Sequence, residues 1–215
     1  MKILVLDNYD SFTYNLVHLV ESVSPYKVDV ARNDELSLSK AREYDRIILS
    51  PGPGIPDEAG TMKELVRELA PSKSILGVCL GMQGIAEVFH GKLYNLERVY
   101  HGISSTIRVV HEDELFRGLP GEWAAGRYHS WALDPAQLPE ELEVTAVDET
   151  GIPMALRHKR YRVKGVQFHP ESVMTPHGAR MISNWLGCQQ PAIHIPGKDD
   201  EHFEIDPLRK GYLFC

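Results

Sequence analysis

One cysteine stands between two glycines in the stretch Leu-Gly-Val-Cys-Leu-Gly-Met-Gln at residues 76–83. The apolar residues before Cys79 predict a short strand, and residues 80–89 place apolar side chains at the spacing of a helix. The pattern Gly-x-Cys-x-Gly is typical of a nucleophile elbow, which is a strained turn between a strand and a helix. The flanking glycines permit the tight bend and close packing against a neighbouring element. This stretch therefore predicts an α/β fold with Cys79 at the end of a strand.

The chemistry of Cys79 has two interpretations. The positive end of the following helix dipole favours a thiolate over a thiol, which would make Cys79 a nucleophile. The alternative is a buried cysteine that packs as a small apolar side chain. The elbow by itself does not separate the two.

The residues before the elbow alternate between strand and helix patterns. Continuous apolar runs at residues 2–6 and 46–49 are typical of strands buried on both faces of a parallel sheet, and residues 27–31 predict another strand. Residues 12–23 and 61–69 carry apolar side chains at helical spacing. This order predicts βαβ units, and therefore an α/β fold with a parallel central sheet flanked by helices.

The pattern changes after Gly91, where short β-like runs are separated by turn residues. We expect this half to be mixed or antiparallel and to pack against the parallel half. Residues 176–186 predict one late helix. From Gly187 the sequence becomes polar and aperiodic, which is typical of an extended tail. We therefore predict one domain over residues 1–187 and a tail over residues 188–215.

Composition excludes several classes of protein. The chain has 215 residues with a formal net charge of -7 and no dense cluster of Lys and Arg, which argues against a general nucleic-acid binder. No apolar run reaches the length of a membrane span. Three cysteines, at positions 79, 188 and 215, are odd in number and far apart, which suits a reducing, cytoplasmic environment.

A loop rich in glycine and proline follows the strand predicted at residues 46–49. Its sequence, Ser-Pro-Gly-Pro-Gly-Ile-Pro at residues 50–56, is stiff and leaves the backbone N–H groups of the glycines free. Such a loop can present N–H groups to an anion or to a carbonyl oxygen. The alternative is a rigid turn without chemistry.

A second candidate segment is Gly-Val-Gln-Phe-His-Pro-Glu-Ser at residues 165–172. It predicts a buried strand, with His169 and Glu171 on the same side of an extended chain. Because ligands of open α/β sheets bind at the carboxyl ends of the strands, we expect His169 to approach Cys79. His169 would then take the proton of the thiol, and Glu171 would orient the imidazole. Alternatively, His169 is an ordinary loop residue, or His169 and Glu171 are metal ligands whose remaining partners the sequence does not supply.

Together, these three segments resemble the signatures of class I glutamine amidotransferase domains. The opening Asp-Asn-Tyr-Asp-Ser-Phe-Thr-Tyr-Asn at residues 7–15 is similar to the glutaminase subunits of anthranilate synthase and aminodeoxychorismate synthase, as is Arg-Tyr-His-Ser at residues 127–130. The resemblance covers about residues 1–186. Three separate motifs in the right order are more specific than any one of them, and they favour the catalytic interpretation of Cys79.

The resemblance implies a flavodoxin-like fold, with a parallel or mixed central sheet flanked by helices and an additional small antiparallel β element. It implies a catalytic triad of Cys79, His169 and Glu171, with neither a metal nor another cofactor. Trp131 stands where relatives usually have leucine, so its role is expected to be a backbone one. The residues implied to bind glutamine or to form the oxyanion hole are Gly52, Pro53, Gly54, Leu80, Gln83, Ser130 and Trp131.

The implied function is hydrolysis of L-glutamine and delivery of the ammonia to a larger, chorismate-binding synthase subunit, in a heterodimer or heterotetramer. The resemblance favours anthranilate synthase and hence tryptophan biosynthesis, with aminodeoxychorismate synthase of folate biosynthesis as the alternative. Two other classes stay open, which are a γ-glutamyl hydrolase that acts without a partner and a non-catalytic regulator of a synthase.

Overall fold

The computed structural model describes residues 1–188. The tail predicted at residues 188–215 lies outside the described residues except for Cys188, so the predicted domain boundary stays a prediction. Among the described residues, no helix has the length and the apolar character that crossing a membrane requires.

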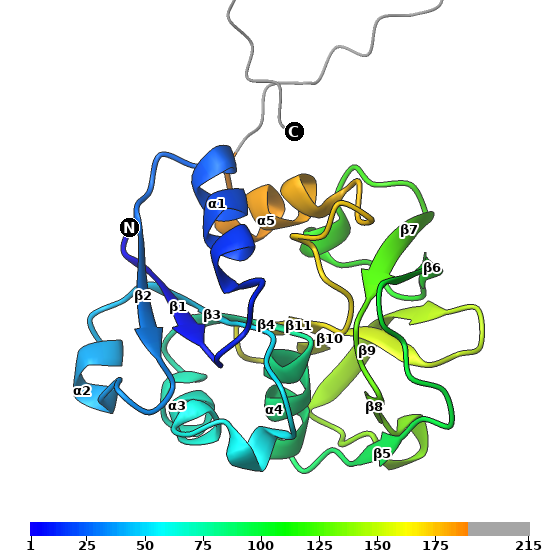
Figure 1. Cartoon of the computed structure of the whole chain (residues 1–215), viewed down its shortest axis with the longest axis horizontal. Coiled ribbons are helices and arrows are strands. Elements are labelled where there is room, and N and C mark those ends of the chain that lie inside the picture. The colour runs from blue at the N-terminus through cyan, green and yellow to red at the C-terminus, as the bar shows by residue number, and fades with distance from the viewer. Residues whose placement is uncertain (189–215) are drawn as a thin grey trace, which may run out of the picture.

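A nine-stranded mixed sheet runs through the molecule (Figure 1). Five neighbouring strands are parallel, and they lie in the order β2 (Val28–Arg32), β1 (Ile3–Asp7), β3 (Arg46–Leu49), β4 (Ser74–Val78) and β11 (Val163–Val166). Four antiparallel strands continue the sheet as β10 (Pro153–His158), β9 (Leu142–Asp148), β6 (Ile103–Val109) and β7 (Glu122–Arg127). A separate antiparallel pair consists of β5 (Leu93–Asn95) and β8 (Trp131–Leu133).

Helices cover both faces of the parallel part of the sheet (Figure 1). On one face α1 (Thr13–Val23) packs against α5 (Gly178–Leu186), and on the other α3 (Met62–Leu69) packs against α4 (Leu80–Val88). The remaining helical segments are α2 (Leu38–Ala41), η1 (Pro56–Glu58), η2 (Glu114–Phe116) and η3 (Pro135–Gln137).

Burial explains the continuous apolar runs of the parallel strands. All five residues of β4 are buried, because a strand in the middle of the sheet has helices on both faces. Two apolar cores result. One contains Leu16 and Val20 of α1 together with Trp185 of α5, and the other contains Met62 and Leu65 of α3.

The predicted fold class is confirmed, but the predicted arrangement of the two halves is wrong. The strands of the second half do not form a separate layer packed against the parallel half; they extend the same sheet. The strand β11 returns from late in the chain and pairs in parallel with β4, with Val166 opposite Val78. The predicted small antiparallel element is present as β5 and β8.

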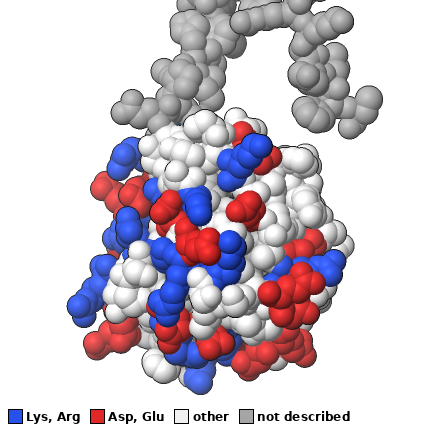
Figure 2. Space-filling view, turned by 90° about the vertical axis from the view of Figure 1, so that its left-hand side faces the viewer, with Lys and Arg blue, Asp and Glu red and all other residues white. Residues whose placement is uncertain are grey.

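Charged side chains of both signs alternate on the face shown in Figure 2. Exposed ion pairs of the protein include Lys40 with Glu43 at 2.9 Å and Arg42 with Glu68 at 3.1 Å. Exposed pairs of this kind contribute little to stability.

Close packing between α4 and β3 depends on Gly81. A Cβ atom added at Gly81 would lie 2.5 Å from the carbonyl oxygen of Leu49 and 2.7 Å from its Cβ. Because these atoms belong to a buried central strand, they cannot move aside. We expect Gly81→Ala to lower the free energy of unfolding by about 1–2 kcal/mol, since an overpacking cost of up to about 3 kcal/mol outweighs the helix-propensity gain of about 1 kcal/mol.

Urea denaturation measures this difference. Gly121→Ala is the matched control, because a Cβ at Gly121 has no heavy atom within 4 Å. The control should change the free energy of unfolding by less than about 0.5 kcal/mol. Equal free energies of unfolding of the two variants would show that a Cβ at position 81 does not clash with Leu49.

Candidate active site

Cys79 occupies a sharp turn between β4 and α4. Its φ and ψ angles are 52° and -104°, a conformation that residues other than glycine rarely adopt. The turn is held on one side by the neighbouring strand, because the Cys79 N–H donates to the carbonyl oxygen of Val166 at 2.8 Å. Strained backbone of this kind is typical of a nucleophile elbow. The side chain is nearly buried, with 6% of the residue exposed, and it lines a cavity.

His169 and Glu171 follow β11, so they lie at the same edge of the sheet as Cys79. The imidazole Nδ1–H of His169 donates to Oε1 of Glu171 at 2.7 Å, and both side chains are buried. The predicted extended chain between them is wrong. The strand ends at Val166, and a turn closed by the Ser172 N–H donating to the carbonyl oxygen of His169 at 3.2 Å brings the carboxylate back to the ring.

The charge of His169 is set by its two neighbours. Burial acts to lower its pKa, but interactions with Cys79 and Glu171 outweigh burial and raise the pKa to about 10. The ring is therefore an imidazolium at neutral pH. Its Nε2 has no hydrogen-bond partner among the described residues. Catalytic hydrogen bonds often tighten only when the substrate binds.

Two aromatic side chains surround the imidazole. The ring centroid of Tyr128 lies 4.8 Å from that of His169 in an edge-on arrangement, and that of Phe12 lies 5.7 Å away. Phe12 comes from the loop after β1 and Tyr128 from the segment after β7. Apolar rings in these positions limit the access of water to the His169–Glu171 pair.

The cavity beside Cys79 has a volume of ≈ 170 Å³. This size suits an amino acid better than a drug-sized ligand, whose pockets start at about 300 Å³. All seven residues predicted to bind glutamine or an oxyanion line it, together with Tyr128 and His129. The predicted residues are Gly52, Pro53, Gly54, Leu80, Gln83, Ser130 and Trp131.

The loop that carries Gly52 is held by the end of β1. The backbone N–H of Asn8 donates to Oγ of Ser50 at 2.9 Å, and the Asn8 side-chain amide donates to the carbonyl oxygen of Ser50 at 2.8 Å. A Cβ atom at Gly52 would lie 2.7 Å from both the carbonyl oxygen and the Cβ of Asn8. Glycine is therefore needed at position 52 for this approach.

Sequence reasoning assigned no role to Gln167, which the structure places against the sulfur. Its Nε2 donates to Sγ of Cys79 at 3.5 Å, and its Oε1 accepts from Nε2 of Gln83 at 3.2 Å. Gln83 Nε2 also donates to the carbonyl oxygen of Trp131 at 3.0 Å, so Trp131 takes part through its backbone. The local signal for Gln167 in the sequence is a polar residue between two apolar ones, and the structure shows that it is fully buried.

His129, like Tyr128, lines the cavity without having had a predicted role. It is 6% exposed, and burial together with the nearby Arg127 lowers its pKa to about 4. The imidazole is therefore neutral at pH 7. Its Nδ1 lies 2.8 Å from the carbonyl oxygen of Trp131.

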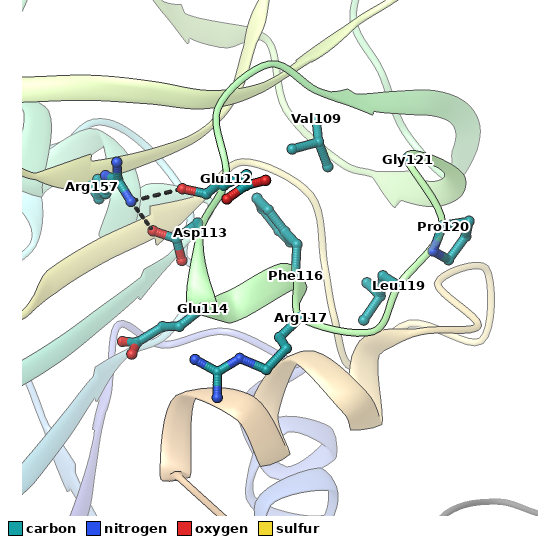
Figure 3. A pocket seen from close by; sticks show the side chains of 10 residues that line it. All are labelled: Val109, Glu112, Asp113, Glu114, Phe116, Arg117, Leu119, Pro120, Gly121 and Arg157. Atoms are coloured by element: carbon teal, nitrogen blue, oxygen red, sulfur yellow. Dashed lines mark hydrogen bonds and ion pairs between the residues drawn. The ribbon is translucent and has the colours of Figure 1, made fainter.

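A larger cavity of ≈ 610 Å³ lies elsewhere, lined mainly by the connection from β6 to β7, which includes η2 (Figure 3). Arg157 lines it and donates from Nη1 to the carbonyl oxygen of Glu112 at 2.8 Å and to Oδ2 of Asp113 at 3.3 Å. None of the predicted site residues lines this cavity.

A comparison with protein families shows to which family the chain belongs. The model described as glutamine amidotransferase class-I matches residues 4–187. The chain belongs to this family. A solved glutamine amidotransferase from Thermotoga maritima shares its fold, with a TM-score of 0.67 and 18% identity over 87% of this chain and 81% of the other.

Several curated relatives carry more specific names. This amidotransferase is 44% identical to anthranilate synthase component 2 of Porphyra purpurea, over 86% of this chain and 98% of the relative. It is 44% identical to aminodeoxychorismate/anthranilate synthase component 2 of Bacillus subtilis, over 86% of this chain and 95% of the relative. It is also 42% identical to the bifunctional protein TrpGD of Thermotoga maritima, over 97% of this chain but only 36% of that longer protein.

Proposed function

We propose that this amidotransferase is the glutaminase subunit of an anthranilate synthase, which hydrolyses L-glutamine and delivers ammonia to a larger subunit that acts on chorismate. The observation that carries the proposal is a strained Cys79 that lines the cavity and interacts with His169, whose ring is hydrogen-bonded to Glu171. The similarity to component 2 proteins along nearly their whole length supports the choice of partner.

The first half of the proposed reaction forms a thioester. The Cys79 thiolate attacks the carbonyl carbon of the glutamine side chain. His169 then gives its proton to the amide nitrogen, the carbon–nitrogen bond breaks, and ammonia leaves the thioester. The oxyanion accepts hydrogen bonds from the backbone N–H groups of Leu80 and of Gly52 or Gly54. Each such donor contributes about 3–4 kcal/mol in other hydrolases. Pro53 has no N–H group, so it can only fix the shape of the loop.

The second half releases glutamate. His169, now neutral, takes a proton from water, and the resulting hydroxide attacks the thioester carbonyl. The carbon–sulfur bond breaks and the Cys79 thiolate is regenerated beside the imidazolium. Glu171 keeps the ring in one orientation through both steps. The residues Gln83, Ser130 and Trp131 bind the glutamine.

Delivery of the ammonia explains the need for a partner. Ammonia released into neutral water becomes mostly ammonium, which is not nucleophilic, so it has to pass directly to the acceptor site. We propose that the loop at residues 7–11 faces the synthase subunit, since its Asp10 interacts with the charges of His169 and Glu171 and its Tyr9 is 50% exposed. The complex is proposed to be a cytoplasmic heterodimer or heterotetramer.

Reconstitution tests this division of labour. We expect the isolated chain to form no aminated product from glutamine and chorismate, and a purified anthranilate synthase large subunit to restore glutamine-dependent synthesis of anthranilate. Formation of anthranilate by the isolated chain would contradict the proposal. If only an aminodeoxychorismate synthase subunit restored glutamine-dependent amination of chorismate, the alternative pathway would be assigned. Cleavage of γ-glutamyl peptides without any partner would favour a hydrolase.

A further inference from the structure

Arg127 is a fully buried cation at the end of β7. Its Nη1 donates to Oδ2 of Asp148 at 2.6 Å and to Oγ of Ser105 at 3.2 Å. The side chains of Arg127 and Asp148 are both 0% exposed. The ring of Tyr100 covers the guanidinium, with its centroid 3.5 Å from Cζ.

Stability alone does not account for this pair. Buried ion pairs often gain no more from their attraction than their desolvation costs. Arg127 also has a buried Nη2 that finds no hydrogen-bond partner among residues 1–188, which adds a further cost. Arg127 is therefore a candidate for a role in the neighbouring cavity that contains Cys79.

A chain of hydrogen bonds runs from Arg127 to the cavity. The Nε–H of Arg127 donates to Nε2 of His129 at 3.1 Å. Because arginine can only donate, Nε2 of His129 must be the acceptor and the proton of the neutral imidazole must be on Nδ1. That Nδ1–H donates to the carbonyl oxygen of Trp131 at 2.8 Å, the same oxygen that accepts from Gln83 at 3.0 Å.

The opposite tautomer would break both contacts of the ring. A proton on Nε2 would face the N–H of Arg127, and a lone pair on Nδ1 would face the carbonyl oxygen of Trp131. The groups that act on the charge of His129 are Arg127 on its own segment, Asp148 on β9 and His169 after β11, and Tyr100 stacks on the ring with centroids 5.6 Å apart. Only Arg127 among them donates a hydrogen bond to the ring.

We propose that Arg127, anchored by Asp148, is a positioning residue for glutamine binding, which acts by fixing the tautomer of His129. The fixed ring holds the carbonyl group of Trp131, and this group in turn holds the amide of Gln83 at the wall of the cavity. The inference rests on the proposed function, because it assigns glutamine to that cavity. It concerns binding of the substrate and not the reacting atoms.

Glutaminase kinetics on the complex with the large subunit test this role. The variant is Arg127→Met combined with Asp148→Asn, which avoids leaving a lone carboxylate in the interior. We expect KM for glutamine to rise by roughly tenfold or more, with kcat changed by less than about threefold, because ground-state binding is lost and the Cys79–His169 pair is not touched.

The matched control is Arg157→Met. Arg157 also forms ion pairs within the sheet, at 2.6 Å with Glu143 and 3.3 Å with Asp113, but it lies away from the cavity that contains Cys79. This variant should keep the KM of the unmodified enzyme. An unchanged KM in the Arg127 variant, or an equal rise in both variants, would overturn the proposal.

Imidazole ¹⁵N NMR of the unmodified protein tests the tautomer without any folding risk, with His129 assigned from the spectrum of His129→Gln. We expect a protonated Nδ1 and an unprotonated Nε2. A protonated Nε2 would overturn the proposal even if the Arg127 variant failed to fold. If the protein showed this tautomer but hydrolysed no glutamine, the proposed function would fail and the tautomer assignment would survive.

Discussion

Replacing Cys79 by alanine is expected to abolish glutamine hydrolysis while leaving the fold intact. Loss of a covalent nucleophile lowers kcat by several orders of magnitude, and we expect a fall on the order of 10⁴-fold or more. The physical reason is that the proposed acyl intermediate forms on the Cys79 sulfur, whereas the amides of the oxyanion loop only stabilise charge. Ammonia released from glutamine, measured with the full complex, gives the rate.

Two controls separate chemistry from structure. Cys188→Ala changes the other cysteine within the described residues, which is only partly buried and lies outside the cavity, so it should leave the rate unchanged. The Cys79→Ala complex should still make anthranilate when ammonium salt replaces glutamine, because the acceptor site is on the other subunit. Normal glutamine turnover by Cys79→Ala would remove the basis of the proposed mechanism.

Replacing His169 by asparagine is the second large effect. We expect kcat/KM for glutamine to fall by about 10³-fold or more, since His169 acts as acid in one half of the reaction and as base in the other. The variant should also slow alkylation of Cys79 by iodoacetamide at pH 7. The imidazolium that favours the thiolate is then missing.

The control for His169→Asn is His18→Asn, because His18 is an exposed residue of α1. This control should change neither the rate of glutamine hydrolysis nor the rate of Cys79 alkylation. The kcat/KM of Glu171→Gln for glutamine should lie between those of His169→Asn and His18→Asn. Glu171→Gln keeps a hydrogen-bond acceptor for the ring but removes the negative charge that helps to raise the pKa of His169. Unchanged alkylation of Cys79 in His169→Asn would mean that the two side chains do not act as a pair.

Local sequence patterns predicted the parts of the fold that depend on local chemistry. The buried parallel strands β1 and β3 were visible as continuous apolar runs, and the glycines around Cys79 marked the elbow. The insertion of β11 beside β4 was not visible, because pairing between segments so far apart leaves no mark in either segment. The sequence therefore suggested two packed halves where there is one continuous sheet.

In the candidate site, too, the features set by local sequence could be predicted and those set by tertiary contacts could not. Cys79, His169 and the glycine loop could be predicted, because their residue types and their positions after strands indicate chemistry. The contacts of Gln167 and of the Arg127–His129 chain could not, since they depend on tertiary positions of polar side chains. The turn at Pro170 and Glu171 was also missed, because two residues at alternate positions suggested an extended chain.

Covalent labelling tests the central claim most directly, which is that Cys79 attacks the side-chain carbonyl of glutamine. A glutamine analogue with a diazo ketone in place of the amide should alkylate the protein once, in step with the loss of activity, and glutamine should protect against it. Mass spectrometry of the digested protein is predicted to find the label on Cys79 and none on Cys188 or Cys215. A label on either of those cysteines, or inactivation without any label on Cys79, would contradict the account.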